Sequence, residues 1–429
     1  MVCYFCYFSV KINQFLEYKC LLPEFIIMKI TFVSILLSIL LLISGPRSII
    51  ATGYTSENKN SKDSSIITIP FPLKLGNVSD EYKTQKHNLI QQFYNKYIGS
   101  PWFSGSFIVA KNGHILFENY QGQSNIKNNT EMSATTAIHL ASVSKVLTAT
   151  AILKLVDGDN IELDQLVTDW LPKFPYKSTT IRMLLNHRSG MQHYSRFPDL
   201  LKKSWNRKKI LTNQDILDIM VNRKVKMIYK LDAKFDYCNT NYVILALIIE
   251  KATGLDYRKA MQELIFKPLG MKNTFVFNYT TDRDTVSMSY KGKNIAFHWD
   301  QFDQLYGDKN IYSTPRDLVK FDLATYSPDF INPEILKEAF IGYSPQPKTM
   351  KNYGLGMRMK EWPTGQRLTY HNGWWHGNNT SYTTLKKDTV TIICLSNKYS
   401  AKPYQSLKLS SVFGDYPFEK LELDTLSTE

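Results

Sequence analysis

Residues 142–156 read SVSKVLTATAILKLV, a run that is apolar on every side except at Lys145 and Lys154. A helix without a polar face belongs inside a domain, so this run predicts a buried central helix around which other elements pack. Ser142 opens the helix, and Lys145 follows one turn later on the same face, where its amine can reach the serine hydroxyl. Ser142 and Lys145 are therefore the first candidates for chemistry.

A serine beside a lysine can act as a nucleophile with its activating base. A serine hydroxyl attacks well only when a neighbouring base removes its proton, and burial would lower the pKa of Lys145 toward that of such a base. The helix start would also direct free N–H groups at a developing oxyanion. The spacing is weak on its own, because it recurs at Ser56/Lys59 and Ser124/Lys127 in polar stretches. An N-cap serine beside a lysine that extends to solvent is the simpler alternative.

A second polar cluster stands at the entrance of another predicted helix. Tyr237-Cys238-Asn239 precedes an apolar helix predicted over residues 241–252, which Gly254 would close. A tyrosine beside a lysine cation can shuttle protons, an asparagine amide can hold a carbonyl group, and Cys238 is interpreted as space-filling. Tyrosine and asparagine are also ordinary turn residues, so the tripeptide needs independent support.

A third cluster, His371-Asn372-Gly373, is predicted at the end of a strand and is followed by Trp374 and Trp375. Glycine lets a backbone approach closely, which suits a strand edge that binds substrate through main-chain groups. A strand that ends in an Asn-Gly turn explains the same residues equally well. The cluster is thus a third candidate with an open structural alternative.

The remaining pattern predicts strands at both ends of the chain and helices between them. Residues 106–110 and 114–118 alternate apolar and polar positions around Lys111-Asn112-Gly113, which is a hairpin signal. Three consecutive strands are predicted near the C-terminus, over residues 367–370, 380–385 and 389–395. This order predicts an α+β fold, with a sheet assembled from both ends and an inserted helical part, rather than regular βαβ alternation.

In their order and spacing, the three clusters resemble the SxxK, YxN and HxG motifs of the serine β-lactamase and penicillin-binding protein family. The similar patterns are those of class C β-lactamases, DD-carboxypeptidases and related esterases. Further matching segments are LLNHRSGM at 184–191, NTNY at 239–242, PLGM at 268–271 and YGLGM at 353–357. The resemblance runs from about Gly105 to Asn397. It implies a β-lactamase/transpeptidase-like fold: an antiparallel sheet built from both chain ends and packed by helices, plus a helical subdomain.

Residue by residue, the resemblance implies that Ser142 is the acylated nucleophile and that Lys145 and Tyr237 share the base and acid steps. The implied substrate-binding residues are Asn239, His371, Gly373 and Trp374. Asn239 would position the substrate amide, and the two residues of the HxG motif would form the substrate-binding strand. The backbone N–H groups of Ser142 and Trp374 would form the oxyanion hole.

The implied function is an exported serine hydrolase that acts through a Ser142 acyl-enzyme on amides or esters, of D-peptide, ester or β-lactam type. Trp374 and Trp375 stand where the family usually has small residues, so they could narrow the acyl pocket or form an aromatic wall. We therefore expect peptidase or esterase activity ahead of β-lactam hydrolysis. The alternative function is a non-catalytic protein that keeps the fold and binds a ligand without turnover.

No metal or cofactor site is predicted. His187 is interpreted as a satisfied core or loop histidine, and His193, His298 and His376 show no metal-ligand spacing. The sequence has no HExxH segment, no Gly-x-Ser-x-Gly elbow and no phosphate-binding glycine loop. The expected partner is a small-molecule or peptide substrate, with cell-wall fragments as one source, and not nucleic acid.

The N-terminal region predicts export to the periplasm or the extracellular space. Met28-Lys29 precede an apolar run from Ile30 to Ile43 and a turn-forming SGPR segment, the pattern of a signal peptide. The run is shorter than the roughly 20 residues of a spanning helix, but an uncleaved membrane anchor remains an open alternative. Translation is expected to start at Met28. The predicted organisation is a leader (1–53), a flexible polar lead (54–65), the hydrolase domain (66–420) and a tail (421–429).

Composition is compatible with a folded exported enzyme. Of the 429 residues, 43% are hydrophobic and 13% aromatic, which is enough to form a core. Five cysteines are too few for a disulfide scaffold, and only Cys238 and Cys394 lie beyond the leader, so one optional disulfide remains open. The leader contains four cations and two anions, so its removal changes the net charge only from +14 to +12. The sequence has no Lys/Arg block of the kind typical of a nucleic-acid-binding tail. We therefore expect the positive charge to favour contact with anionic cell-envelope polymers.

Overall fold

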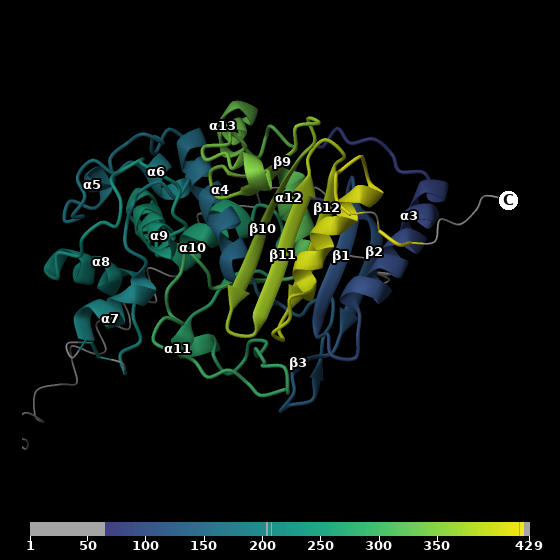
Figure 1. Ribbon diagram of the computed structural model, residues 1–429, viewed down its shortest axis with the longest axis horizontal. Helices are drawn as coiled ribbons and strands as arrows, with labels where there is room; N and C mark the ends of the chain where they lie inside the picture. Colours follow the sequence, from purple (N-terminus) through teal and green to yellow (C-terminus); the bar gives the residue numbers. More distant parts are fainter. Residues whose placement is uncertain (1–64, 203–204, 207, 420, 424–429) are drawn as a thin grey trace, which may run out of the picture. The chain divides into compact units, whose positions relative to one another are not determined.

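The computed structural model describes residues 65–202, 205–206, 208–419 and 421–423, so the predicted leader and most of the polar lead lie outside the described residues. Its largest element is a seven-stranded antiparallel sheet of order β2-β1-β12-β11-β10-β9-β8 (Figure 1). The strands are β1 (Gly105–Lys111), β2 (His114–Gln121), β8 (Lys351–Tyr353), β9 (Arg358–Glu361), β10 (Arg367–Trp375), β11 (Asn378–Leu385) and β12 (Val390–Ser396). The prediction of an antiparallel sheet built from both chain ends is confirmed.

The first hairpin forms where the alternating pattern predicted it. Asn112 and Gly113 join β1 to β2 with φ angles of 52° and 81°, the left-handed conformation that two-residue hairpin turns require. On its other side β1 pairs with β12, with Phe107 opposite Cys394. The first and the last strand of this sheet along the chain are therefore neighbours in space.

The two faces of the sheet pack against different helices. On β12, Ile393 and Leu395 face one core, whereas Ile392 and Cys394 face the other. The first core includes helices α4 (Ser144–Asp157), α9 (Asn239–Thr253) and α12 (Pro315–Ala324), and the second includes α3 (Asp80–Phe93) and the helical segment η7 (Lys402–Val412). In Figure 1, η7 (yellow) lies in front of the sheet, and α4 and α12 lie behind it. The sheet is thus covered on both faces.

The two predicted apolar helices are present and lie in the first core. A short 3₁₀ turn, Ala141–Val143, leads into α4, so the predicted helix begins two residues later than Ser142. The helix α9 begins at Asn239 and ends at Thr253, and Gly254 with a φ of 69° is the left-handed cap that the sequence predicted. The candidate serine and the candidate YxN segment therefore both lie at helix starts.

The HxG motif lies inside a strand and not at its end. Strand β10 continues to Trp375, and Asn372 and Gly373 pair with Ser381 and Thr380 of β11. The alternative of an Asn-Gly turn is wrong, because cross-strand pairing with β11 keeps this segment extended beyond the motif. Main-chain groups on both sides of Gly373 are therefore held in a regular sheet.

The remaining helices are shorter and come mostly between the two halves of the sheet. They are α5 (Val167–Trp170), α6 (Ile181–Leu185), α7 (Phe197–Leu201), α8 (Asn213–Asn222), α10 (Tyr257–Met261), α11 (Tyr279–Asp282) and α13 (Pro333–Ala339). Two small sheets complete the fold: β3 (Gln123–Asn125) with β4 (Thr130–Glu131), and β5 (Ile138–His139) and β6 (Phe275–Val276) on either side of β7 (Ile311–Ser313). No helix in the described ranges has both the length and the apolar character needed to cross a bilayer.

Candidate active site

Ser142 lies in a tightly held turn directly before α4. The preceding residue, Ala141, has a φ of 49°, a left-handed conformation that is unfavourable for a residue with a side chain. The turn is held by hydrogen bonds from the Thr380 hydroxyl to the Leu140 carbonyl (2.7 Å) and from the Ala141 N–H to the ring of His139 (3.0 Å). Residues of the sheet therefore fix the serine in position.

Gly373 of the HxG motif contacts this same turn. A Cβ atom at Gly373 would lie 2.4 Å from the Leu140 carbonyl oxygen, 2.2 Å from the Thr380 hydroxyl and 3.0 Å from the Ala141 Cβ. Side-chain carbon atoms do not approach other atoms this closely. The glycine is therefore required for the close approach of β10 to the serine turn, which brings the SxxK and HxG motifs together.

Lys145 is completely buried and points at Ser142. Its Nζ donates hydrogen bonds to the Ser142 hydroxyl (3.1 Å) and to the backbone carbonyl of Asp308 (2.8 Å). The same nitrogen lies 5.1 Å from the ring centroid of Tyr237 and 5.6 Å from that of Tyr242. The simpler alternative of a lysine that extends to solvent is wrong. The geometry instead places an amine within proton-transfer distance of the serine hydroxyl.

Tyr237 and Asn239 lie on the segment that enters α9. The hydroxyl of Tyr237 and the Oδ1 atom of Asn239 are both buried without a hydrogen-bond partner among the described residues. Buried polar atoms are normally satisfied, so two such atoms in this segment, whose Tyr237 ring lies beside Lys145, mark a place where a substrate can supply the partners. The structure thus brings the three predicted catalytic residues, Ser142, Lys145 and Tyr237, into one site.

His187 holds the YxN segment in place. Its Nδ1 accepts the backbone N–H of Cys238 (3.1 Å), and its carbonyl accepts the N–H of Asp236 (2.9 Å). Its ring lies 4.3 Å from that of Tyr237, centroid to centroid. Burial lowers the pKa of His187 well below its usual range, so the ring is neutral. The prediction that His187 is a satisfied structural histidine is confirmed.

His187 also begins a chain of hydrogen bonds that ends at the HxG motif. Since its Nδ1 is an acceptor, its Nε2 carries the proton and donates to the hydroxyl of Tyr353 (3.1 Å). That hydroxyl lies 3.3 Å from Nε2 of His371, whose Nδ1 donates to the Asn372 carbonyl (2.8 Å). Burial lowers the pKa of His371 well below its usual range. Both ring nitrogens of this predicted substrate-binding residue are therefore engaged within the protein.

The two tryptophans after the HxG motif have different environments. Trp374, predicted to give an oxyanion-hole N–H, has a side chain that is 61% exposed, whereas Trp375 packs against the first core. The indole N–H of Trp375 donates to the buried carboxylate of Asp303 (2.7 Å). Successive side chains of a strand point to opposite faces, so only Trp375 lies on the face that carries His371 and Gly373. Trp374 therefore lies on the opposite face of the strand, and a narrowing of the acyl pocket by Trp375 stays a prediction.

Asp303 is the centre of the one described group with metal-ligand geometry, in which ligand atoms of Asp300, Asp303 and His376 lie within 4.8 Å of one another. The carboxylate of Asp303 already accepts hydrogen bonds from the Trp375 indole and from the backbone N–H of Asp300, and it contacts the His376 ring at 3.0 Å. These hydrogen bonds account for the close approach of the three side chains, and they hold the Trp375 indole in place. The expectation that no metal is bound stays a prediction.

Sequence patterns did not point to three charged residues beside the site. The guanidinium carbon of Arg358, in β9, lies 4.7 Å from the ring centroid of Tyr237. Asp308 and Lys309 lie in the loop before β7, and the Asp308 carbonyl contacts Lys145. None of the three belongs to a periodic pattern or to a catalytic spacing. Only the course of the chain brings them to the site.

Comparisons with known proteins agree with this fold. A family model described as Beta-lactamase matches residues 100–409. Penicillin-binding protein 4* of Bacillus subtilis (strain 168) is 30% identical over 344 residues, which cover 77% of this chain and 76% of the relative. A D-aminopeptidase of Cereibacter sphaeroides is 22% identical over 71% of this chain and 59% of its own length. The crystal structure of a penicillin-binding protein from Bacillus halodurans matches with a TM-score of 0.65 at 21% identity, covering 76% of this chain and 99% of that one.

Fold and relatives together define a serine hydrolase with the β-lactamase/transpeptidase fold. The chain belongs to the β-lactamase family, and the part matched by the family model contains the SxxK, YxN and HxG clusters.

Proposed function

We propose that this protein is an exported hydrolase that forms an acyl-enzyme at Ser142 on amide or ester substrates. The observation that carries the proposal is the 3.1 Å contact between the Lys145 amine and the Ser142 hydroxyl on a strained, buried turn. The described hydrogen-bond partners of Lys145 are a hydroxyl and a backbone carbonyl, and neither is a carboxylate. An amine so placed can take the serine proton as the hydroxyl attacks.

The reaction then follows from the positions of the other groups. Lys145 accepts the proton of Ser142 while the serine oxygen bonds to the substrate carbonyl carbon. The negative oxygen formed in this step would be stabilised by the backbone N–H groups of Ser142 and Trp374. Tyr237 would deliver a proton to the leaving group and regain one from the Lys145 ammonium, which restores both groups, and Asn239 would hold the substrate amide. Water finally hydrolyses the Ser142 ester.

Arg358 supports a substrate that carries a carboxylate. Its guanidinium stacks near the rings of Tyr237 and Tyr353, at 4.7 and 5.8 Å from their centroids. No hydrogen bond or ion pair joins this guanidinium to another described residue. A guanidinium binds carboxylates through two parallel hydrogen bonds, so Arg358 is suited to the free carboxylate of a D-peptide or of a β-lactam. The names of the relatives, penicillin-binding protein and D-aminopeptidase, point to the same substrate classes.

Activity-based labelling tests the acyl-enzyme. The purified protein should be labelled by a fluorophosphonate or a fluorescent penicillin, and Ser142→Ala should abolish the label. Ser195→Ala, at an exposed serine, is the matched control and should label as the unmodified protein does. Label that persists in Ser142→Ala would contradict the assignment. Tight ligand binding without labelling by any probe would favour the alternative of a non-catalytic binding protein.

Substitution of Arg358 tests the substrate class. For a D-peptide with a free carboxylate, Arg358→Gln should lower kcat/KM by about 10- to 100-fold, the worth of a charge-assisted hydrogen-bonded pair. The amide-capped form of the same peptide should be hydrolysed by both proteins at similar rates. Arg367→Gln, an exposed arginine on β10 that pairs with Glu361, is the control. An equal loss on both peptides would contradict a carboxylate-binding role.

Export is proposed from the apolar run between Ile30 and Ile43 and its flanking residues, which lie outside the described part of the chain. Cell fractionation and N-terminal sequencing of the mature protein test it, and a cytoplasmic product that retains Cys3 would contradict it. The basic surface is proposed to contact anionic cell-envelope polymers. Sedimentation with cell walls should then decrease from low to high salt, because added ions screen such contacts.

A further inference from the structure

We propose that Asp308, Lys309 and Tyr194 form a buried charged unit that positions Lys145 and balances the charge around it. The inference rests on the proposed roles of Ser142 and Lys145. It adds three residues that act through the lysine and that belong to none of the three motifs. Their side chains contact neither Ser142 nor Lys145 Nζ by any described hydrogen bond or ion pair, and Asp308 holds the lysine through its backbone carbonyl, so they are positioning residues.

The loop that carries Asp308 and Lys309 lies along the start of α4. Three hydrogen bonds join the two segments: Thr148 Oγ1 to the Gly307 carbonyl (2.7 Å), Lys145 Nζ to the Asp308 carbonyl (2.8 Å) and the Ile311 N–H to Ser144 Oγ (3.2 Å). On its other side the loop touches α9, since a Cβ at Gly307 would lie 2.2 Å from the carbonyl oxygen of Tyr242. Residues 307–311 are thus fixed between the two helices that carry the SxxK and YxN motifs.

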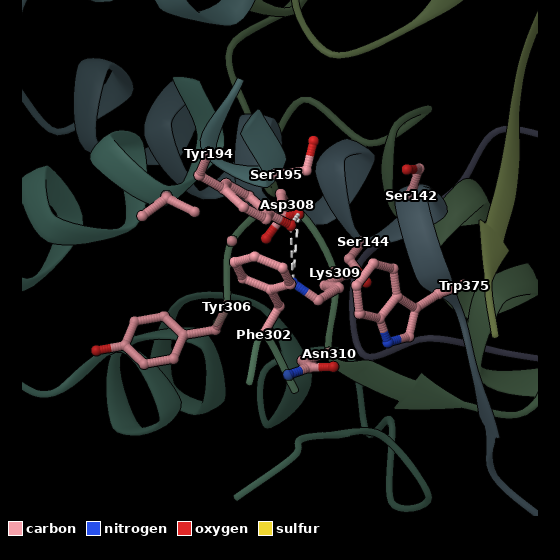
Figure 2. Close-up of polar contacts among 12 residues, drawn as sticks. Ser142, Ser144, Tyr194, Ser195, Phe302, Tyr306, Asp308, Lys309, Asn310 and Trp375 are labelled. Carbon is pink, nitrogen blue, oxygen red and sulfur yellow. Dashed lines mark hydrogen bonds and ion pairs between the residues drawn. The ribbon is translucent and has the colours of Figure 1, made fainter. Parts of the chain in front are cut away.

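The side chains of the unit contact one another away from solvent, although Asp308 Oδ1 is buried without a hydrogen-bond partner among the described residues. The Tyr194 hydroxyl donates to Asp308 Oδ2 (2.7 Å), and Lys309 Nζ donates to the Tyr194 hydroxyl (2.9 Å) and lies 3.6 Å from Asp308 Oδ2 (Figure 2). Asp308 and Tyr194 are fully buried and Lys309 is 2% exposed. The ring of Trp375 lies 4.6 Å from Lys309 Nζ. Burial lowers the pKa of Lys309, and the carboxylate of Asp308 opposes this change.

The charges of the unit act on Lys145 in opposite directions. The same residue whose backbone carbonyl holds Lys145 also carries a buried carboxylate, and an uncompensated carboxylate would stabilise the ammonium form of Lys145. That form cannot take the Ser142 proton. Lys309 compensates this carboxylate, so the pair holds the Asp308 carbonyl in place without adding a net charge beside the base.

The charge around Lys145 comes from only some of its titratable neighbours. Those described as facing it or interacting with it electrostatically are Tyr237, Tyr242, His187, His193, His371, Asp308 and Lys309. Burial lowers the pKa of each of the three histidines, which keeps them neutral. The fixed charges in this set are those of Asp308 and Lys309. Arg358 beside Tyr237, and Asp300 and Asp303 around Lys309, are the further charged groups nearby. Changing Asp308 or Lys309 should therefore alter the pH dependence of acylation.

The test is the pH dependence of the rate constant for fluorophosphonate labelling of Ser142 in the full-length protein. Lys309→Met should slow labelling at pH 7 about tenfold and move the acid limb of the profile up by about one pH unit, as expected for an uncompensated buried charge nearby. Asp308→Asn, which keeps the backbone carbonyl and an oxygen acceptor for Tyr194, should move the limb in the opposite direction. The double variant should return it toward the position in the unmodified protein.

Lys320→Met is the matched control, because Lys320 belongs to another partly buried ion pair, with Asp317 on α12. It should leave the acid limb in place. Rates that fall in both single variants without opposite shifts of the limb would show a purely structural role and overturn the proposal. If Lys309→Met does not fold, Asp308→Asn and the double variant still decide the direction of the shift. A lack of labelling in the unmodified protein would instead contradict the proposed function itself.

Discussion

Gly373 shows how one missing side chain brings two motifs together. The space that a Cβ atom would need is taken by the Leu140 carbonyl oxygen, the Thr380 hydroxyl and Ala141. Ala141 is itself in the left-handed region, so the turn before Ser142 cannot relax away from the strand without cost. The position of Ser142 therefore depends on close packing around Gly373, whose missing side chain takes no part in the reaction.

Substitution of this glycine should disable the site and destabilise the fold. Gly373→Ala forces the serine turn away from β10, and we expect the free energy of unfolding to fall by about 2–4 kcal/mol, as in overpacked cores. Labelling of Ser142 should fall with it. Denaturant unfolding and labelling rates measure the two effects. Gly292→Ala, where no atom lies within 4 Å of the new Cβ, is the control and should change neither. Unchanged labelling in Gly373→Ala would contradict the packing argument.

Among the elements, the hydrogen-bonded chain His187–Tyr353–His371 connects three separate segments. His187 follows α6, Tyr353 ends β8 and His371 lies in β10. The Tyr353 hydroxyl is the shared partner, because it accepts from one histidine and donates to the other. The chain thus fixes the distance between the segment that enters α9 and the strand that carries the HxG motif.

Removal of this hydroxyl should loosen the contact between these elements. Tyr353→Phe leaves two buried ring nitrogens without a partner, which should lower the free energy of unfolding by about 2–3 kcal/mol. Tyr370→Phe is the matched control, since that tyrosine lies on the opposite face of β10, in the second core, with no described hydrogen bond. Chemical denaturation of both variants measures the difference. A control variant as unstable as Tyr353→Phe would contradict the assigned role of the chain.

At the scale of the whole molecule, the sheet separates two cores, and each contains one of the cysteines beyond the leader. Cys238 lies in the first core and Cys394 in the second, and both are free and buried. Burial raises the pKa of the Cys238 thiol to about 11. The disulfide that the sequence left open is therefore not formed.

This separation predicts the redox behaviour of the protein. A reducing agent should leave the melting temperature unchanged, and both thiols should react with iodoacetamide only after denaturation, because a buried, protonated thiol is a poor nucleophile. Mass spectrometry of the alkylated protein counts the modified cysteines. A disulfide-linked peptide that contains Cys238 and Cys394 would contradict the described fold.

Stability of the whole molecule should also depend on pH through its buried histidines. Burial lowers the pKa values of His139 and His193 to about 4, from the usual 6.5. Between pH 6.5 and 4 the unfolded chain binds protons that the folded protein does not. The free energy of unfolding should therefore fall on acidification, by about 1.4 kcal/mol per pH unit for each such histidine. The full contribution of these groups is present above pH 6.5.

Urea unfolding at pH values from 7.5 to 4.5 measures this dependence. His193→Gln should reduce the dependence of the unfolding free energy on pH by the contribution of one histidine, about 1.4 kcal/mol per pH unit. His298→Gln, at an exposed position, is the control and should keep the slope of the unmodified protein. Stability that rises on acidification over this range would contradict the prediction.

Several parts of the fold and site were predictable because their signals are local. The apolar runs of α4 and α9, the left-handed cap at Gly254 and the Asn112-Gly113 turn follow from residues adjacent in the chain. The three motifs, taken together, also indicated Ser142, Lys145 and Tyr237 as one site. The full length of β10 was not predictable, because its last residues are extended by pairing with β11 and not by their own pattern.

The amino-acid sequence was thus sufficient for the α+β class, the two motif helices and the nucleophile with its lysine, since periodicity and motif spacing act over a few residues. Only the tertiary structure decided which distant groups surround that lysine. The Asp308 carbonyl that contacts Lys145 is 163 positions away, and Tyr353 lies 166 positions from His187. Contacts at such separations depend on how the chain crosses between α4 and α9, and no local pattern encodes that path.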